Sequence, residues 1–405
     1  MTTRSRHGDK TERQVRRAQM KDAEVPVAPF FALGVFMPID FIQTVPPVIL
    51  DGARYGTALL IMFLVHSARR TSRPVPILGV VAFLLIFSGG LSVLKSVVFD
   101  GNLFAPIVSL VSPLVAYLVV RTQVNHRWIL LGFTFGCFLS ALDILLQASG
   151  LPFLGTPSEY GFRHSGFSYS STAVAPLLAV AICVALMPWV WEKRRTVLRI
   201  ILVCVLLIAL FLSQGRGGLA GLMAALAILA FIYLPRKPGL TIIATLVGGL
   251  AIVISGAAAA LVDYISRTDI PGSSDITSGR ANLNFAAWEA FWRAGVLGVD
   301  PAESHHYNPH MAPLSAALNI GPFGLIATSV VCILLLVVIF FAGRDFPIVL
   351  RMIAGIAFTV SLIEPNGFFV GFTGAVLVMI CFANYRRNKS GSQQNEQWVG
   401  ADMSV

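Results

Sequence analysis

Apolar runs long enough to cross a membrane recur along nearly the whole chain, and they limit its fold more than any other feature. A helix needs about 20 mostly apolar residues to cross the hydrocarbon core of a bilayer. We therefore predict an all-α polytopic membrane protein with about twelve transmembrane helices. The segments lie near 28–49, 53–68, 75–96, 103–120, 128–148, 168–190, 196–213, 217–234, 239–262, 312–342, 347–363 and 367–384.

Composition and charge placement favour a membrane protein over a soluble or nucleic-acid-binding one. Only 12% of the residues are charged, whereas soluble domains carry about 25%. The net charge of +10 could suggest a nucleic-acid partner, but nearly all charges lie in short connectors between apolar runs. We therefore expect no nucleic-acid partner. The five cysteines lie inside apolar runs without CxxC spacing, which predicts neither a disulfide nor a thiolate metal site.

Lys and Arg residues divide unequally between alternate connectors. With the N-terminus placed in the cytoplasm, 23 of the 30 fall on the inner side and seven on the outer side. Cytoplasmic loops of membrane proteins carry such an excess, so we predict that both termini are cytoplasmic. The chain then divides into a basic cytoplasmic tail (1–27), a transmembrane domain (28–385) and a disordered cytoplasmic tail (386–405).

Two connectors on the outer side are long, one at 149–167 and one at 263–311. The second contains SGRANLNFAAWEAFWRAGVLG, whose pattern predicts a helix. At helical spacing one face carries Phe285, Trp288, Phe291 and Trp292, opposite Asn284 and Glu289. We expect this helix to lie in the plane of the membrane interface with its aromatic side down.

Four outer-face residues are candidates for chemistry, namely Arg163, Arg216, Arg280 and His310. They are far apart in the sequence, but the predicted topology brings them to one surface. Arginine at this depth is costly, and in membrane proteins it is usually functional or paired. A guanidinium offers a planar fork of donors to phosphate oxygens. Three such forks around one site suit a pyrophosphate.

Arg216 is the sharpest of these candidates, because it lies in a very short turn, SQGRGG, between two apolar runs. Gly215, Gly217 and Gly218 flank it and would let a backbone or a ligand approach closely. A structural alternative stays open for all three arginines. They would then reach lipid headgroups or pair with a carboxylate, for which the candidates are Asp263, Asp269, Asp275 and Glu364.

His310 is the natural proton acceptor of this set, since an ordinary histidine pKa of about 6.5 suits a general base near neutral pH. A metal site is the rival interpretation, because His305 and His306 lie nearby. His306 and His310 are four residues apart, but Pro309 between them disfavours a regular helical turn. No acidic or thiolate residue stands at ligand spacing, so we predict no metal and no cofactor.

Three acidic residues, Asp40, Asp143 and Glu364, lie inside or at the ends of apolar runs. We interpret each as a buried structural partner rather than a catalyst. Glu364, at an outer turn, is also placed to orient an arginine or the histidine.

Several short motifs occur in a fixed order along the second half of the chain. His310-Met311 is followed after nine residues by Gly321-Pro322-Phe323-Gly324. The other motifs are Arg163 in RHSGF, Arg216 in SQGRGG, Ser278-Gly279-Arg280 ahead of Trp288, and Leu297-Gly298-Val299. Together they resemble the motifs of bacterial O-antigen ligases and related Wzy-type polysaccharide polymerases, over about residues 150–380. The chain departs from the family at Met311, where a polar residue is usual, and Asn308 stands nearby.

The resemblance implies a multi-span, GT-C-like glycosyltransferase of the bacterial inner membrane, with its active site on the periplasmic face and no metal or cofactor. The implied donor is a glycan on undecaprenyl pyrophosphate. The implied acceptor is a hydroxyl of lipid A–core, for a ligase, or of a lipid-linked repeat unit, for a polymerase. Membrane lipids would surround the spans, and a lipid-facing groove would hold the polyprenyl chain.

Under this resemblance each candidate residue takes a role. Arg163, Arg216 and Arg280 would bind the pyrophosphate, and His310 would accept the proton of the acceptor hydroxyl, with inversion at the anomeric carbon. The supporting residues would be Gly215, Gly217, Gly321, Gly324 and Glu364.

Two other classes of protein remain open at this point. A transporter or flippase for lipid-linked or anionic solutes also suits twelve spans, although such proteins often show two similar halves. A scaffold protein would leave the costly outer arginines without a reason. The sequence does not separate ligase from polymerase.

Overall fold

In the part of the chain that the computed structural model describes, helices joined by turns and loops form the fold, and no strand is present apart from two isolated β-bridges. The described residues are 26–67, 75–99, 101–121, 126–156, 163–186, 196–233, 280–300, 307, 309–343, 346–364, 368 and 371–385. The helices in them are α2 (Ala28–Phe36), α3 (Pro47–Ser67), α4 (Pro76–Val98), α5 (Phe104–Val120), α6 (His126–Ala148), α7 (Ser171–Leu186), α8 (Thr196–Ser213), α9 (Arg216–Tyr233), α12 (Arg280–Arg293), α14 (Ala312–Phe341), α15 (Ile348–Ile363) and α16 (Phe372–Tyr385).

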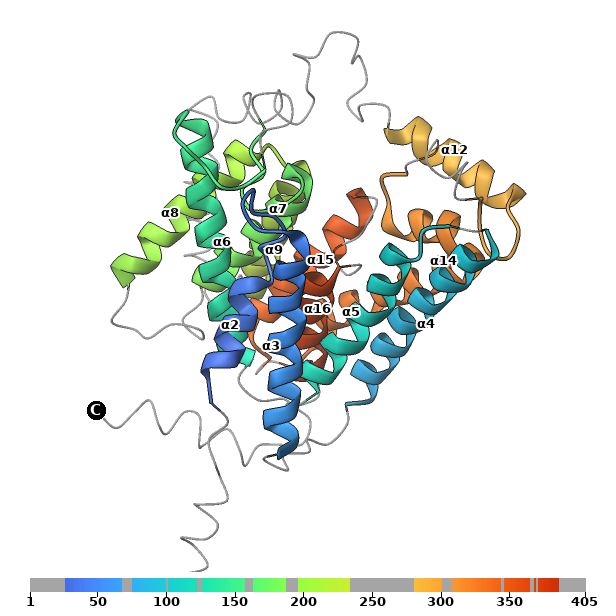
Figure 1. Cartoon of the computed structure of the whole chain (residues 1–405), viewed down its shortest axis with the longest axis horizontal. Helices are drawn as coiled ribbons and strands as arrows, with labels where there is room; N and C mark the ends of the chain where they lie inside the picture. Colours follow the sequence, from blue (N-terminus) through green and yellow to red (C-terminus); the bar gives the residue numbers. More distant parts are fainter. Residues whose placement is uncertain are drawn as a thin grey trace, which may run out of the picture.

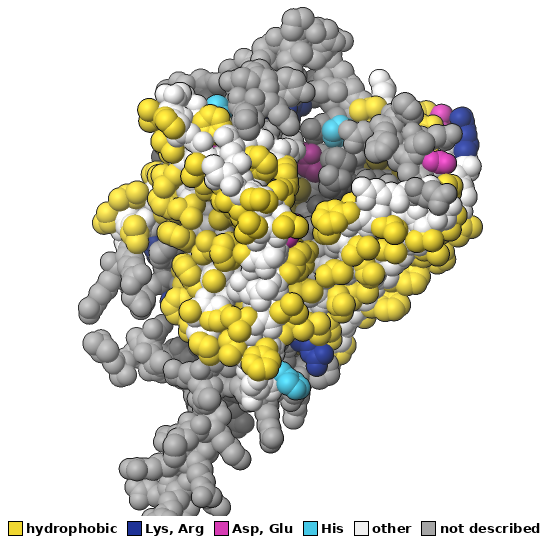
Figure 2. Space-filling model, viewed as in Figure 1, with side chains coloured by type: hydrophobic (Ala, Val, Ile, Leu, Met, Phe, Trp, Pro, Cys, Tyr) yellow, Lys and Arg dark blue, Asp and Glu magenta, His cyan; other side chains and the backbone are white. Residues whose placement is uncertain are grey.

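Five of these helices, α3, α4, α6, α8 and α14, are long and apolar enough to cross a membrane. The helices α5, α7, α9, α15 and α16 are apolar but shorter. Apolar side chains cover much of the described surface seen in Figure 2. Exposed ones include Phe63 on α3 and Phe83 on α4. A soluble monomer does not expose apolar surface on this scale. The chain is therefore a helical, multi-pass membrane protein.

The core of the bundle is formed by α7, α15 and α16, whose residues are mostly buried. In Figure 1 α16 lies near the middle of the bundle, with α4 and α5 on one side and α6 and α8 on the other. Alanine and glycine are frequent in α7 and α15, and small residues allow helix backbones to pack closely in a membrane protein. The outer helices enclose this core and carry the exposed apolar surface.

The predicted spans at 28–49 and 53–68 are wrong in their boundaries. The first segment holds only the nine-residue α2, and one long helix, α3, begins at Pro47. Proline is tolerated in the first turn of a helix, where its missing N–H would have no partner anyway. Arg54 of α3 reaches back to the connector between the two helices, where it forms an ion pair with Asp40 at 2.8 Å and donates to the Ile39 carbonyl at 2.9 Å. Arg54 therefore holds the turn between α2 and α3, which the apolar pattern of the sequence does not indicate.

The predicted span at 312–342 is a broken helix rather than a continuous one. Ile320 and Gly321 have non-helical dihedral angles, with φ of +69° at Gly321. The next residue is Pro322, which has no N–H to donate to the Leu318 carbonyl four residues earlier. The chain therefore leaves the helix at Gly321 and starts a new helical segment at Pro322.

Several sequence predictions lie outside the described residues. They are the predicted span at 239–262, nearly all of both tails, and about half of the long connector at 263–311. Within that connector the structure describes 280–300, 307 and 309–311. The helix predicted there is confirmed as α12.

Candidate functional site

Arg216 is the first residue of α9, and its turn packs directly on α7. A Cβ atom added to Gly218 would overlap the backbone of Ala175, and one added to Gly215 would lie 2.9 Å from the Ser171 carbonyl oxygen. The glycines beside Arg216 therefore allow two helix backbones to touch. This contact holds the N-terminal end of α9 at a fixed height on the bundle core.

The segment that carries Arg163 contacts the end of α8 just before Arg216, through a backbone hydrogen bond of the next residue, His164. The His164 N–H donates to the Leu212 carbonyl at 3.4 Å, in the last turn of α8 and four residues before Arg216. His164 is itself buried, and this burial lowers the pKa of its imidazole and favours the neutral form. The structure thus brings the segments that carry Arg163 and Arg216 together, although 53 positions separate them in the sequence.

Side chains of α6 hold the loop that carries Arg163 through hydrogen bonds. The buried Asp143 carboxylate accepts hydrogen bonds from the Leu154 N–H at 2.7 Å and from the Gly155 N–H. The Ser140 hydroxyl accepts from the Phe167 N–H at 3.0 Å. These bonds place Asp143 as a structural partner, in agreement with its interpretation from the sequence.

Glu364 lies beside the same turn. It follows α15, where its N–H donates to the Val360 carbonyl, and it is buried. A Cβ atom added to Gly217 would lie 2.9 Å from Glu364 Oε1. The absence of a side chain at Gly217 therefore makes room for the Glu364 carboxyl group next to Arg216. We call the group formed by Arg163, Arg216 and Glu364, with the turns that carry them, the arginine corner.

His310 lies two residues before the start of α14 and is hydrogen-bonded to α12. Its N–H donates to Asn284 Oδ1 at 2.7 Å. Arg280 is the first residue of α12, four residues before Asn284, which is about 6 Å along a helix axis. The backbones of Arg280 and His310 therefore belong to one corner, while the side chain of Arg280 lies outside the described residues.

The helix α12 packs on the first part of α14 through a small second core. Its members are Ala287, Ala290, Phe291, Val299, Leu314, Ala317 and Leu318. We call α12, residues 295–300, His310 and the first part of α14 the histidine corner. This corner meets the long bundle mainly through α14, whose second part continues into it.

The aromatic residues predicted on one face of α12 are unevenly buried, and the orientation of that face toward the membrane stays a prediction. The rings of Trp288, Phe291 and Trp292 do lie together, with centroids between 5.3 and 5.6 Å apart. Phe291, however, is only 7% exposed because it faces α14, whereas Phe285 is 66% and Trp292 69% exposed. Helical spacing gave the aromatic face but could not show that α14 covers one edge of it.

Gly321 and Gly324 lie where the backbone packs too closely for a side chain. Gly321 adopts a positive φ, and a Cβ atom there would overlap the Val296 carbonyl oxygen, so the residues after α12 lie directly against the break in α14. A Cβ atom on Gly324 would overlap the Ala316 carbonyl oxygen, eight residues earlier, which shows how sharply the chain bends.

Met311 occupies the N-cap position of α14 and makes no side-chain capping bond. Ser, Asn and Asp usually satisfy a free N–H at this position. Met311 instead packs against the second core. At this N-cap position the chain therefore has an apolar contact in place of a capping bond.

Both corners lie at the same end of the bundle. Gly217 of α9 touches Glu364 after α15, so the start of one helix meets the end of the other. At the opposite end Arg351 of α15 donates to the Gly343 carbonyl at 2.7 Å, just after α14 ends. The start of α14 and the end of α15 therefore point the same way. Figure 2 shows acidic, basic and histidine side chains bordering a hollow at this end, between α7 and α12.

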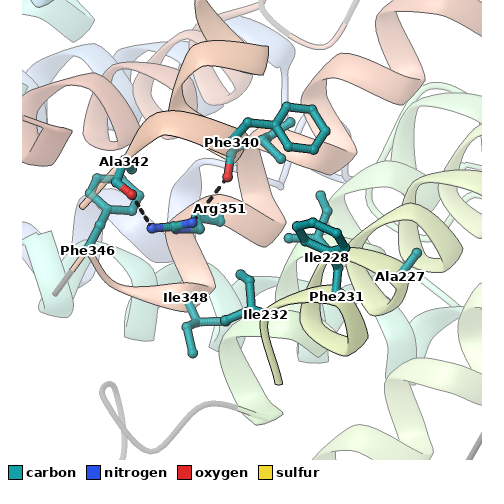
Figure 3. A pocket seen from close by; sticks show the side chains of 10 residues that line it. Ala227, Ile228, Phe231, Ile232, Phe340, Ala342, Phe346, Ile348 and Arg351 are labelled. Carbon is teal, nitrogen blue, oxygen red and sulfur yellow. Dashed lines mark hydrogen bonds between the residues drawn. The ribbon is translucent and has the colours of Figure 1, made fainter. Parts of the chain in front are cut away.

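An apolar cavity of about 850 Å³ lies at the other end of the bundle. Figure 3 shows Phe231, Phe340 and Phe346 lining it, with Arg351 bonded to backbone carbonyls at its edge. Phe231 is 15 residues from Arg216 on α9, which is about 22 Å along the helix axis. The cavity is therefore separate from the candidate site.

Metal-binding groups of three or more His, Cys, Asp or Glu side chains do not occur among the described residues. His305 and His306 lie outside this part of the chain. No family model and no curated protein matches this sequence. The proposed function therefore rests on the two corners.

Proposed function

We propose that this protein is a membrane glycosyltransferase of the O-antigen ligase or polysaccharide polymerase type. The observation that carries the proposal is the arginine corner, where the Arg163 and Arg216 segments and the buried Glu364 meet at the end of the bundle that also carries His310. Fixed cations beside a general base at one membrane surface suit group transfer from a lipid-linked pyrophosphate.

The chemistry of such a transfer has two requirements. The pyrophosphate leaving group gains negative charge as the bond to the anomeric carbon breaks, and Arg163, Arg216 and Arg280 would stabilise that charge without a metal. The acceptor hydroxyl must lose its proton as its oxygen attacks the anomeric carbon, and His310 would take it. Attack opposite to the leaving group inverts the anomeric centre. Glu364 would orient Arg216.

The proposed donor is a glycan on undecaprenyl pyrophosphate, and the proposed acceptor is lipid A–core or a second lipid-linked repeat unit. The protein would lie in a bacterial inner membrane with both termini in the cytoplasm and both corners on the periplasmic side. The exposed apolar surface of the spans would face membrane lipids and the polyprenyl chain of the donor.

A transporter or flippase is the second candidate, and the break in α14 is the observation that favours it. Broken helices in transporters offer free backbone carbonyls to a solute or ion. In α14 the carbonyl released by Pro322 is that of Leu318, and it accepts hydrogen bonds from the Val299 N–H at 2.8 Å and from Lys95. Because this carbonyl is already satisfied, the break supports a fixed corner better than a transport site.

Purified enzyme with a lipid-linked donor and an acceptor tests the proposal. We expect His310→Ala and Arg216→Ala each to lower transfer by at least about a thousandfold, from the loss of the base and of leaving-group stabilisation. Ser92→Ala is a control on α4, where the half-buried hydroxyl bonds to the Ser88 carbonyl of the same helix. Full activity of His310→Ala would disprove the mechanism, and movement of intact lipid-linked sugar across proteoliposomes would favour the transporter.

Two further measurements define the reaction. We expect EDTA to leave transfer unchanged, and loss of activity with the chelator would revive a metal site. Deletion of the gene followed by gel analysis of surface glycan separates the two acceptors. Full-length but unattached chains indicate a ligase, and single repeat units on core or loss of exopolysaccharide indicate a polymerase.

A further inference from the structure

Lys95 lies in the last turn of the apolar helix α4 and is only 5% exposed. Its ammonium group donates hydrogen bonds to two backbone carbonyls, that of Val299 at 2.5 Å and that of Leu318 at 3.4 Å. A buried charge is costly unless hydrogen bonds satisfy it. Both of its acceptors belong to the histidine corner, so this cation joins α4 to a part of the chain more than 200 residues away.

The Leu318 carbonyl is available to Lys95 because α14 is broken. In a continuous helix it would accept the N–H of residue 322, which is a proline and has none. The carbonyls at the C-terminal end of a helical segment also carry partial negative charge, which favours a nearby cation. Lys95 therefore acts as a C-terminal cap for the first segment of α14, together with the Val299 N–H.

This first segment, 312–319, is held at both ends. Its N-terminal end follows His310, whose N–H is bonded to Asn284. Its C-terminal end is bonded to Val299 and Lys95. Eight helical residues span about 12 Å and move as a rigid unit. A shift at the Lys95 end is therefore transmitted to the position of His310 at the other.

We infer that Lys95 is a positioning residue for His310, and that α4 is thereby part of the functional site. The inference rests on the proposed function, since it assigns Lys95 a place in that same reaction. Lys95 does not need to touch the donor or the acceptor. It fixes the C-terminal end of the segment whose N-terminal end presents the base.

The test compares Lys95→Met, which keeps most of the apolar length of the side chain but removes the donor, with Lys95→Arg, which keeps a cationic donor. We expect Lys95→Met to lower kcat about tenfold or more and to change the donor KM much less, because two of the three arginines proposed to bind the pyrophosphate, Arg163 and Arg216, lie in the arginine corner and are untouched. Lys95→Arg should recover most of the lost kcat. Ser92→Ala is the matched control one turn earlier, where the hydroxyl bonds only to the Ser88 carbonyl of its own helix.

Hydrogen exchange on the full-length protein in lipid nanodiscs gives a second readout, independent of activity. We expect Lys95→Met to speed exchange of the Val299 and His310 amides about tenfold, with no change at the Leu154 and Gly155 amides of the arginine corner. If Lys95→Met does not accumulate in the membrane, Lys95→Gln, which retains an amide donor, is measured in its place with the same expectation at smaller size.

The outcomes separate this inference from the proposed function. If His310→Ala and Arg216→Ala abolish transfer but Lys95→Met has wild-type kcat and wild-type exchange, Lys95 does not position the base. If His310→Ala and Arg216→Ala keep full transfer, the proposed function fails instead. Equal losses of kcat in Lys95→Met and Lys95→Arg would also overturn the inference, because a cationic donor would then not be what matters.

Discussion

The arginine corner and the histidine corner lie at the same end of the bundle but are built differently. The arginine corner stands on α7, α9 and α15, which belong to the large core, and its glycines bring backbones into direct contact. The histidine corner has a separate core of seven residues and is fastened by a few hydrogen bonds. The arginine corner is therefore part of the rigid bundle core, whereas the histidine corner stands on an element that single substitutions can displace.

Among substitutions that change only the packing of the two corners, Gly321→Ala in the histidine corner has the largest expected effect. The substitution places a side chain in a backbone region that essentially only glycine adopts, which costs about 1–3 kcal/mol, and also drives a methyl group into the Val296 carbonyl. We expect transfer to fall by more than about a hundredfold while the bundle still inserts, since the strain is confined to the break in α14. Activity and circular dichroism of the purified protein measure the two quantities.

Gly79→Ala is the matched control for this substitution. Gly79 lies in α4, and a Cβ atom there meets nothing within 4 Å. We expect wild-type activity, or a slight gain in stability, because alanine is the better helix former by about 1 kcal/mol. Equal loss in both variants would show that the break at Gly321 has no special importance.

Two neighbouring aromatic residues test how α12 is attached. Phe291 is buried against α14, whereas Trp292 is 69% exposed. We expect Phe291→Ala to cost about 3 kcal/mol of local stability, because it leaves a cavity in a very small core, and to expose α12 to protease. Trp292→Ala should leave protease resistance unchanged. The reverse order would mean that α12 packs on α14 through its other edge.

Asp143→Asn makes the corresponding test in the arginine corner. Asp143 accepts N–H bonds from Leu154 and Gly155 and from the Gln147 side chain, and an asparagine has one acceptor oxygen fewer. We expect a loss of about 2 kcal/mol in stability, measured by thermal unfolding in detergent. Transfer should fall only severalfold, since Arg216 and Glu364 are held by other contacts. A drop as large as that of Gly321→Ala would show that the arginine corner is no more rigid than the histidine corner.

The sequence predicted much of the fold because apolar length is a local property. The segments at 196–213, 217–234 and 347–363 match α8, α9 and α15 to within a residue. The pattern failed where a distant partner decides the structure. Arg54 and Asp40 end α2 early, and the break in α14 requires Val296 and Val299 to cover it.

The sequence indicated which residues belong to the candidate site, but not how they are placed relative to one another in the fold. Arginines on the disfavoured side of the membrane and a glycine-flanked turn were visible in the sequence, and so was Lys95, as one of seven outer cations. Its bonding partners lie 204 and 223 residues away, and no spacing pattern reaches that far. The division into two corners with separate cores could likewise be found only in three dimensions.

The smallest expected effect, Gly217→Ala, sharpens the comparison most. Its new methyl group would lie 2.9 Å from Glu364 Oε1 and from Glu364 Cγ, atoms of a side chain that can move. At Gly218, one residue on, the same change meets the fixed backbone of Ala175. We expect Gly217→Ala to keep the wild-type melting temperature and to lower transfer severalfold, because it displaces the carboxyl group that we propose orients Arg216, whereas Gly218→Ala should lower the melting temperature itself. If both variants lose stability equally, the Glu364 side chain is as fixed as the helix backbone. It would then belong to the packing of α9 on α15 rather than to the chemistry of the arginine corner.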